Sequence, residues 1–244
     1  MRSALPDAAL ILAGGLGTRL RPITNKIPKP LVMIGKKPTI AHIIDEIYRN
    51  GISDIYVSVG YKAWLIERYL RGYGSAARIR LIKEKTLLGT GGAIKLALGK
   101  IKADELFVAN GDDLFRMDIG KMYAFHKSHN SRVTMCIKKA RSNKELSSSG
   151  VVKLNGFKVV GFAEKPKPED APSRFINIGK YIISADVVKY FPKERRFSFE
   201  RDFLEKAVGK ISVCAYKSKG VWYPTDTFER LSIARRKWHP QPTA

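Results

Sequence analysis

A cluster of glycines near the start of the chain has the composition of a phosphate-binding loop. Residues 12–19 read LAGGLGTR, so a hydroxyl and a cation directly follow three glycines, and Lys29 lies between two prolines further on. Glycine has no Cβ, which lets backbone N–H groups approach phosphate oxygens closely. Arg19 can form paired hydrogen bonds with a phosphate, and Lys29 can add a second positive charge. The loop is neither a Walker loop nor a dinucleotide fingerprint, because no Gly-Lys-Ser/Thr follows and position 20 is leucine.

An aspartate lies where an α/β sheet binds its ligands. Asp112 closely follows the apolar segment Leu106–Ala109, which we expect to form a buried strand. Side chains at the carboxyl ends of parallel strands point into the crevice where open α/β sheets bind ligands. The sequence therefore predicts a carboxylate in that crevice. The histidines at 126 and 129 have no third ligand nearby, and we expect them on a solvated helix face.

The composition is that of a folded and strongly basic protein. Of 244 residues, 44% are hydrophobic, and 45 lysines and arginines outnumber 22 acidic residues to give a net charge of +23. Such a charge attracts nucleic acid, anionic membranes or phosphorylated metabolites. The basic residues are spread along the chain without a long run of like charges. We therefore expect a solvated basic surface and no nucleic-acid partner.

The sequence predicts neither a membrane span nor a signal peptide. No stretch of about 18 apolar residues occurs, and the apolar run near the N-terminus ends in glycines instead of a cleavage site. The two cysteines, Cys136 and Cys214, lie in apolar, strand-like segments without metal-binding spacing. A lone buried pair of this kind is typical of a reducing compartment, so we expect a cytoplasmic protein.

Strands and helices alternate through the first half of the chain, which is typical of βαβ units and a mostly parallel sheet. The expected strands are Ala8–Ala13, Ile55–Val59, Ile79–Ile82 and Leu106–Ala109. The expected helices are Ile40–Asn50, Ala63–Leu70 and Gly92–Leu98.

The second half has a different character. Val151–Leu154 and Val159–Ala163 flank an Asn-Gly turn signal and predict a hairpin. A strand is expected at Ile176–Ile183, a helix at Phe199–Ala207 and a loop over 138–150. We predict one α/β domain over residues 1–244, with a Rossmann-like mixed, mostly parallel sheet, helices on both faces and a small inserted lobe on the substrate side.

The glycine loop and several later motifs resemble a known enzyme family. The pattern GGxGTRLxPxT followed by PKP is similar to the signature of the sugar-1-phosphate nucleotidylyltransferases, also called NDP-sugar pyrophosphorylases. Further motifs continue the likeness in order from Ala8 to about Arg230. The resemblance implies an enzyme that joins an NTP and a mannose- or glucose-type hexose 1-phosphate, with Mg²⁺, to give an NDP-sugar and pyrophosphate. It also implies the short form of the family, because 244 residues leave no room for a β-helix domain.

The resemblance suggests a division of the domain into two halves. An NTP-binding half would extend to about residue 115, a sugar-phosphate-binding half would cover about 116–230, and a basic C-terminal tail would follow. The implied partners are the NTP and the sugar 1-phosphate, and a homo-oligomer is compatible with the family.

Residues 84–93, EKTLLGTGGA, look like the family's base-reading loop, with Thr90 expected to cap the following helix. An ionised carboxylate only accepts hydrogen bonds, so Glu84 matches the adjacent N–H donors of guanine. Uracil and thymine present carbonyls that would repel it. Glu84 thus slightly favours GTP over UTP or dTTP, and CTP stays a further alternative. The predicted nucleotide-binding residues are Leu12, Ala13, Gly14, Gly15, Gly17, Thr18, Glu84 and Gly89.

The resemblance places a Mg²⁺ site on two aspartates. Asp112 matches the carboxylate of the family's GD motif, and Asp226 matches its second metal-binding carboxylate. A cation of this size takes one or two carboxylates together with phosphate oxygens and water. Around Asp226 the chain reads WYPTDT where relatives usually read W-x-D-x-G-T, which is closer to the ending of some cytidylyltransferases.

Two further motifs look like the family's sugar-phosphate site. The segment FAEKP at 162–166 would place Lys165 on the phosphates and Glu164 on the sugar hydroxyls. The segment NIGKY at 177–181 resembles the strand that lines the sugar pocket. The predicted sugar-binding residues are Gly150, Glu164, Asn177 and Gly179.

The implied reaction needs positioning of charged groups and no protein base. A phosphate monoester is already anionic near neutral pH, because its second pKa is about 6. Arg19 and Lys29 would neutralise the leaving pyrophosphate and Lys165 the attacking phosphate, which makes these three the predicted catalytic residues. Two rival hypotheses are a catalytically silent, translation-initiation exchange-factor-like scaffold and a choline-phosphate cytidylyltransferase. The first would lack the phosphate and metal residues, and the second would have little use for Asn177 and Gly179.

Overall fold

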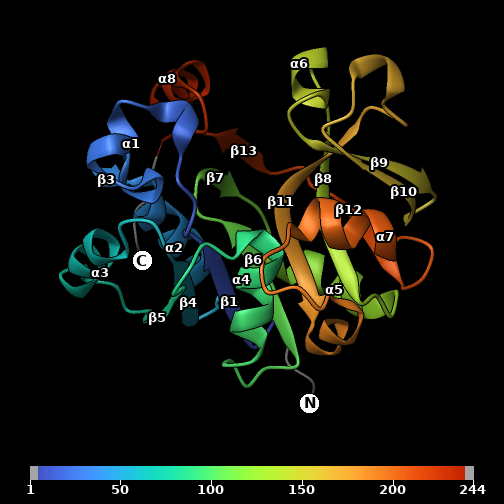
Figure 1. Cartoon of the computed structure of the whole chain (residues 1–244), viewed down its shortest axis with the longest axis horizontal. Coiled ribbons are helices and arrows are strands. Elements are labelled where there is room, and N and C mark those ends of the chain that lie inside the picture. The colour runs from blue at the N-terminus through green and yellow to red at the C-terminus, as the bar shows by residue number, and fades with distance from the viewer. Residues whose placement is uncertain (1–4, 240–244) are drawn as a thin grey trace.

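A nine-stranded sheet forms the centre of the computed structural model, which describes residues 5–239 (Figure 1). Its strands, in spatial order, are β5 (Arg78–Lys83), β4 (Asp54–Val59), β1 (Ala8–Leu12), β6 (Glu105–Asn110), β11 (Phe175–Ser184), β8 (Val133–Lys139), β12 (Val213–Lys217), β10 (Lys158–Glu164) and β9 (Gly150–Asn155).

The sheet is mixed, and its two halves differ in pairing. Strands β5, β4, β1 and β6 pair in parallel, as the strand–helix alternation of the first half predicts. Strand β11 is antiparallel to both β6 and β8, and β10 is antiparallel to both β12 and β9. Parallel pairing returns between β8 and β12. The predicted α/β class with a mixed sheet is confirmed, and the parallel strands belong mainly to the first half.

Helices cover both faces of the sheet because its inner strands are apolar on both sides. Along β1, Ala9 and Ile11 pack with α2 (Thr39–Arg49), α3 (Ala63–Arg71) and α5 (Ile119–Ser128). The alternate residues Ala8 and Leu10 face a second core layer formed with α4 (Gly89–Leu98) and the segment 187–207. Successive side chains of a strand point to opposite faces, so one strand serves both cores.

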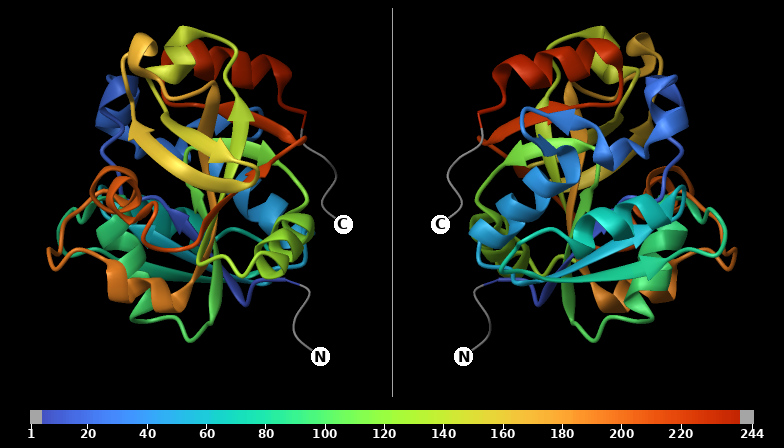
Figure 2. Two further views of the ribbon diagram at one scale, coloured as in Figure 1. Left: turned by 90° about the vertical axis from the view of Figure 1, so that its right-hand side faces the viewer. Right: turned by 90° about the vertical axis from the view of Figure 1, so that its left-hand side faces the viewer.

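Short elements surround the carboxyl ends of the strands. Strands β7 (Asp113–Arg116) and β13 (Val221–Pro224) form a separate antiparallel pair. The β9–β10 hairpin and α6 (Asn143–Leu146) form a small lobe, and Figure 2 shows the yellow hairpin and red α8 (Phe228–Lys237) at the same end of the molecule. The remaining elements are α1 (Ile23–Lys26), α7 (Glu205–Ala207), β2 (Met33–Ile34), β3 (Lys37–Pro38), the 3₁₀ turns Thr18–Leu20, Lys29–Leu31, Pro168–Asp170 and Ala185–Tyr190, and the π-helical turn Phe199–Leu204.

The bounds of most predicted elements of the first half are confirmed within one or two residues. In the second half, the predicted hairpin is confirmed as β9 and β10, and it turns at Gly156, which has φ of 61°. Three expectations are wrong. Leu88 precedes the first residue of α4, so Thr90 lies inside the helix and does not cap it. The stretch 138–150 is not all loop, since it contains the end of β8 and α6. His126 is buried and not solvated, because its ring hydrogen-bonds to the hydroxyls of Thr134 and Ser184.

Both cysteines are buried and unpaired, Cys136 on β8 and Cys214 on β12. Within residues 5–239, none of the helices combines the length and the apolar character that a bilayer crossing requires. The last part of the predicted basic tail, residues 240–244, lies outside the described residues.

Candidate active site

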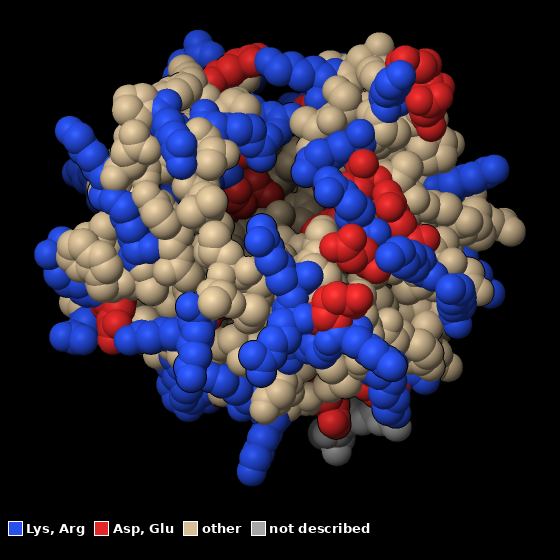
Figure 3. Space-filling model, in the orientation of Figure 1, with Lys and Arg blue, Asp and Glu red and all other residues tan. Residues whose placement is uncertain are grey.

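A single cavity of about 570 Å³ collects every site residue that the sequence predicts. It lies at the carboxyl ends of β1 and β6, between the glycine loop and the β9–β10 lobe. Figure 3 shows a hollow in this face with lysine and arginine side chains around it and carboxylates deeper inside. The predicted residues that line it are Leu12, Ala13, Gly14, Gly15, Gly17, Thr18, Arg19, Lys29, Glu84, Gly89, Asp112, Gly150, Glu164, Lys165, Asn177, Gly179 and Asp226.

The glycine loop leaves β1 and turns through a left-handed residue. Gly17 has φ of +63°, and a Cβ there would lie 2.9 Å from the Cγ2 of Thr24. The Thr24 hydroxyl donates a hydrogen bond to the Gly17 carbonyl at 2.8 Å, which fixes the turn. Only glycine satisfies both the backbone angle and the close approach. The chain then enters the 3₁₀ turn that carries Arg19 into the cavity.

A carboxylate is held in one orientation beside this loop. Glu84 accepts hydrogen bonds from the Ser58 hydroxyl at 3.0 Å and from the Leu88 N–H at 3.1 Å. Gly14 faces it so closely that a Cβ there would lie 2.4 Å from Oε1 of Glu84. These contacts fix the Glu84 carboxylate, and its side chain also lines the cavity.

The glycine of the following turn is also sterically required. Gly89 has φ of +72°, and a Cβ there would lie 2.6 Å from the backbone oxygen of Phe197. This close approach joins the start of α4 to the segment before the π-helical turn.

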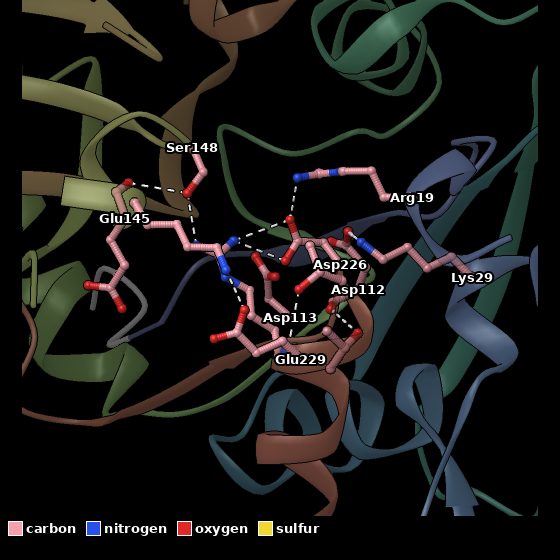
Figure 4. Close-up of polar contacts among 12 residues, drawn as sticks. Arg19, Lys29, Asp112, Asp113, Glu145, Ser148, Asp226 and Glu229 are labelled. Atoms are coloured by element: carbon pink, nitrogen blue, oxygen red, sulfur yellow. Dashed lines mark hydrogen bonds and ion pairs between the residues drawn. The ribbon is translucent and has the colours of Figure 1, made fainter. Parts of the chain in front are cut away.

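Lys29 and Asp112 form an ion pair inside the cavity. The Lys29 ammonium contacts the Asp112 carboxylate directly, and the Lys29 side chain is buried (Figure 4). The Thr225 hydroxyl donates to the Asp112 carbonyl at 2.6 Å, which ties the segment after β13 to the segment after β6. Burial raises the pKa of the Asp112 carboxyl, but the Lys29 charge outweighs it and leaves the pKa below its ordinary value.

Asp226 lies between two arginines. Its carboxylate is 2.5 Å from Arg19 and 3.0 Å from Arg230 (Figure 4). Arg230 also donates to the Ser148 hydroxyl at 2.8 Å, so it connects α8 to the loop before β9. Sequence reasoning missed Arg230. Its spacing of four residues from Asp226, at the start of a helix, is the signal that could have identified it.

Lys180 and Asp113 form a second buried ion pair next to Asp112, and sequence reasoning did not identify it. Lys180 on β11 is fully buried, with its ammonium 3.3 Å from the carboxylate of Asp113. Burial and the neighbouring carboxylates of Asp112 and Asp226 raise the pKa of Asp113, against the effect of Lys180. The residues next to Lys180 on β11 do not reveal its partner, because Asp113 lies 67 residues earlier in the sequence.

The β10 end of the cavity carries the EKP segment. Lys165 has φ of 54°, a left-handed conformation that is uncommon outside glycine and concentrates at functional sites. Its ammonium is 3.0 Å from Glu164, whose other oxygen, Oε2, is buried without a hydrogen-bond partner within residues 5–239. Burial raises the pKa of Glu164. Gly150 faces this carboxylate, since a Cβ there would lie 2.9 Å from its Oε2.

Strand β11 bends at Gly179 to line the same region. Gly179 has φ of +67°, and a Cβ there would lie 2.1 Å from the amide nitrogen of Asn110. The Asn177 side chain donates to the Tyr181 hydroxyl at 2.6 Å and accepts from the Gly179 N–H at 3.1 Å. The pairing of β11 with β8 is interrupted between Asn177 and Tyr181, which turns these groups toward the cavity.

Glu200 is a further cavity residue that the sequence does not reveal. It lies in the π-helical turn and accepts hydrogen bonds from Tyr181 at 3.0 Å, Thr90 at 2.7 Å and Ser198 at 3.1 Å. Ser198 caps the same turn, but Tyr181 on β11 and Thr90 on α4 are distant in the sequence, so only the tertiary fold brings these two to Glu200. The Thr90 hydroxyl thus donates a hydrogen bond to Glu200 and does not cap the helix.

The two aspartates fit a divalent cation of the magnesium type. Carboxylate oxygens are the hard ligands that such a cation takes, usually one or two per site, with phosphate oxygens and water completing the shell. Among residues 5–239, no cluster of three or more histidine, cysteine or acidic side chains is arranged to hold a metal ion by itself. A cation on Asp112 and Asp226 would therefore take its remaining ligands from phosphate and water.

Comparisons with known proteins agree with this geometry. The profile of the family described as Nucleotidyl transferase matches residues 8–239. The D-glycero-alpha-D-manno-heptose 1-phosphate guanylyltransferase of Aneurinibacillus thermoaerophilus is 36% identical over 198 residues, which cover 81% of this chain and 84% of that protein. The mannose-1-phosphate guanylyltransferase of Mycobacterium tuberculosis is 33% identical over 225 residues, 91% of this chain and 61% of that protein.

A solved structure has the same architecture. The crystal structure of HddC from Yersinia pseudotuberculosis superimposes with a TM-score of 0.80 at 30% identity, covering 95% of this chain and 99% of that one. The match of nearly the whole chain to one family profile, together with these relatives, settles the resemblance seen in the glycine loop and the later motifs. The chain belongs to the nucleotidyl transferase family, as one of its sugar-1-phosphate nucleotidylyltransferases.

Proposed function

We propose that this enzyme transfers a guanylyl group from GTP to a manno-configured sugar 1-phosphate and releases pyrophosphate. The observation that carries the choice of base is the orientation of Glu84, whose carboxylate is fixed by Ser58 and the Leu88 N–H beside Gly14. A fixed acceptor pair matches the adjacent N–H donors of guanine and is repelled by the carbonyls of uracil and thymine. The names of the Aneurinibacillus and Mycobacterium relatives support both the base and the sugar configuration.

The chemistry requires no protein base. The attacking oxygen of the sugar phosphate is already anionic near neutral pH. It forms a bond to the α-phosphorus of the nucleotide while the bond from that phosphorus to the bridging oxygen breaks, and pyrophosphate leaves with the electron pair. Among the described residues that line the cavity there is neither a histidine nor a cysteine, which agrees with a reaction of this kind.

The cavity's cations supply the electrostatic part of the reaction. We assign Arg19 and Lys29 to the leaving pyrophosphate and Lys165 to the attacking phosphate, because these side chains line the same cavity from separate elements. Aspartates 112 and 226 would hold Mg²⁺, which supplies charge neutralisation between the phosphates when bound. Holding two polyanions in line can contribute roughly 7–11 kcal/mol to lowering the barrier.

The sugar would bind at the β10–β11 end of the cavity. Glu164 has one buried oxygen without a hydrogen-bond partner among the described residues, which suits a sugar hydroxyl as donor. The Asn177 amide is held by Tyr181 and Gly179, so its orientation is set before substrate binds. We also propose the division at about residue 115 into nucleotide and sugar-phosphate halves, and a cytoplasmic location in which both free cysteines stay reduced.

Pyrophosphate release tests this function directly. The protein is incubated with Mg²⁺ and each of GTP, UTP, dTTP, CTP and ATP, paired with mannose 1-phosphate, D-glycero-α-D-manno-heptose 1-phosphate or glucose 1-phosphate. We expect the largest kcat/KM with GTP and one of the two manno-configured sugars. The Lys165→Ala variant should lose at least about a hundredfold in turnover. Lys167 is also exposed and lies two residues away, and the Lys167→Ala variant should keep its turnover.

Two results would contradict the proposal. A preference for UTP or dTTP would refute the role of Glu84 in base selection. Absence of pyrophosphate release with every pair would favour the non-catalytic scaffold over an enzyme.

A further inference from the structure

A second cavity, of about 450 Å³, lies on the other side of β13 and has no part in the proposed reaction. The end of β8, the start of β11, the connection from β12 to β13 and the start of β13 line this open cavity. Four basic residues line it, and Glu145 is the one acidic side chain among its described lining residues. The basic residues are Lys138, Lys139, Arg141 and Lys217.

Most of the positive charge of this cavity is not neutralised by carboxylates of the described residues. Glu145 pairs with Arg141 at 3.1 Å, so this acid and base cancel. Lys138 donates a hydrogen bond to the carbonyl of Ser218 at 3.3 Å. Lys217 lies over the ring of Phe175, with its nitrogen 4.8 Å from the ring centre. Within residues 5–239, Lys138, Lys139 and Lys217 have no carboxylate partner, and burial lowers the pKa of Lys138.

An unpaired hydrogen-bond donor belongs to the same wall. Trp222 lines both this cavity and the catalytic one. Its indole N–H is buried and has no acceptor among the described residues. Buried polar groups are nearly always hydrogen-bonded, so this indole N–H calls for an acceptor from outside residues 5–239.

We propose that the second cavity binds the phosphate group of a small organic phosphate, such as a nucleotide or a sugar phosphate. Lys138 and Lys217 pair with the phosphate oxygens. Lys217 moves off the ring of Phe175 to do so, and the ring then contacts the organic part. The volume is ample for such a ligand. The site is separate from the residues assigned to GTP and sugar 1-phosphate, so the inference goes beyond the proposed function.

The position of the site gives it a physical link to catalysis. Ile176 lines the second cavity, and its neighbour Asn177 lines the catalytic one. Trp222 lies between the two cavities on β13, the strand that leads to Asp226. A ligand in the second cavity therefore contacts two strands that also shape the substrate site.

Calorimetric titration of the full chain tests the site, with inorganic phosphate, GMP and mannose 1-phosphate as separate probes. We expect two binding events per chain with at least one probe. The Arg19→Ala variant should weaken one event, and the Lys138→Gln/Lys217→Gln variant should weaken the other by at least about tenfold. Lys153→Gln/Lys158→Gln removes the same charge from the exposed hairpin and should keep both events.

The probes and variants separate the possible results. Saturation by inorganic phosphate alone would define a simple anion site, and saturation only by GMP or only by mannose 1-phosphate would identify the organic part. Rescue by Lys138→Arg/Lys217→Arg would show that charge is what matters. A single event with all three probes, or equal weakening in the hairpin control, would overturn the proposal. Loss of the event assigned through Arg19 concerns the catalytic site and leaves this inference intact.

Discussion

The ammonium group of Lys29 contacts the carboxylate of Asp112 although 83 residues separate them in the sequence. One residue follows the glycine loop and the other follows β6, so the pair joins the two segments that we assign to phosphate and metal binding. Lys29 keeps the pKa of Asp112 below its ordinary value in spite of burial. The carboxylate is thus held in the charged form that a divalent cation requires.

Replacing Lys29 with methionine should damage both the site and the fold. The change leaves Asp112 without its nearest cation, so the pKa of that carboxyl should rise and turnover should fall at least about a hundredfold. The free energy of unfolding should fall by about 1–3 kcal/mol. Pyrophosphate release and urea titration measure the two effects. Lys26→Met, at an exposed lysine of α1, is the matched control, and an equal loss there would contradict the assignment.

Removing Arg230 should act through Asp226. The Arg230→Met variant removes one of the two arginines paired with the Asp226 carboxylate and the link from Arg230 to Ser148, so the carboxylate loses its fixed position. We expect turnover to fall at least about tenfold and the half-saturating Mg²⁺ concentration to rise. Initial rates over a Mg²⁺ series measure both. Arg236→Met changes an exposed arginine of the same helix, and unchanged Mg²⁺ dependence in both variants would exclude the positioning role.

Exchanging Glu84 for glutamine should weaken the preference for guanine. A glutamine in the same position presents one donor and one acceptor, which suits the N–H and carbonyl of uracil or thymine. We expect kcat/KM for GTP to fall about a hundredfold relative to that for UTP or dTTP, since an unpaired polar edge is strongly rejected. Parallel assays with the nucleotides measure the ratio. Glu67→Gln, on the outer surface of α3, should leave it unchanged.

The buried imidazole of His126 predicts a pH dependence of stability. Burial lowers the pKa of His126 to about 4 from 6.5, so the unfolded chain binds a proton in this interval that the folded chain does not. Stability should therefore fall as the pH drops from 6.5 toward 4, by up to about 3 kcal/mol. Urea titrations at pH 7 and pH 4.5 measure the loss, and His126→Gln should remove most of it.

Two observations separate this effect from others. His129→Gln, at the residue that follows the same helix, should keep the full loss between pH 7 and pH 4.5. Glu105 lies next to His126 and accepts hydrogen bonds from Lys127 and Tyr123. Burial raises the pKa of Glu105, but these hydrogen bonds outweigh it and hold the pKa below its ordinary value. The stabilisation from Glu105 is present above about pH 4.5 and is lost below it. An identical pH profile in both histidine variants would refute the assignment to His126.

A methyl group at Gly179 should disturb the sugar end of the cavity. The Cβ of Gly179→Ala would collide with the Asn110 side chain, and the left-handed backbone angle disfavours any L-residue. We expect a loss of at least about 2 kcal/mol in unfolding free energy and a raised KM for the sugar 1-phosphate. Gly74→Ala lies in open space and should cost little, so equal effects in the two variants would contradict the steric explanation.

The sequence predicts the parts of this protein that depend on local pattern. The apolar strands β1, β4 and β6, and the hairpin turn at Gly156, follow from periodicity and turn chemistry. The left-handed angle at Gly17 and the crowding at Gly14 explain why the loop motif is recognisable, since no other residue fits there. A backbone angle or a close approach that only glycine allows fixes the residue type at that position, so it can be identified from the sequence alone.

Contacts between distant segments could not be predicted in this way. Glu200 meets Thr90 across 110 residues, and Lys180 meets Asp113 across 67, without any local signal in either segment. The sequence predicts a solvated His126 because no third metal ligand lies nearby, yet the hydroxyls of Thr134 and Ser184 satisfy its ring inside the protein. In each case the burial of a polar group depends on a partner supplied by another element.

The ion pairs of Arg19 and Lys29 with the two aspartates make substrate binding an exchange of partners. Before substrate arrives, these cations are neutralised by carboxylates of the chain itself, so they need not be stripped of a full hydration shell. Phosphates that draw Arg19 and Lys29 away free the Asp112 carboxylate and leave the Asp226 carboxylate paired with Arg230. We therefore expect nucleotide and divalent cation to be taken up together, with each raising the apparent affinity for the other, as reciprocal linkage requires.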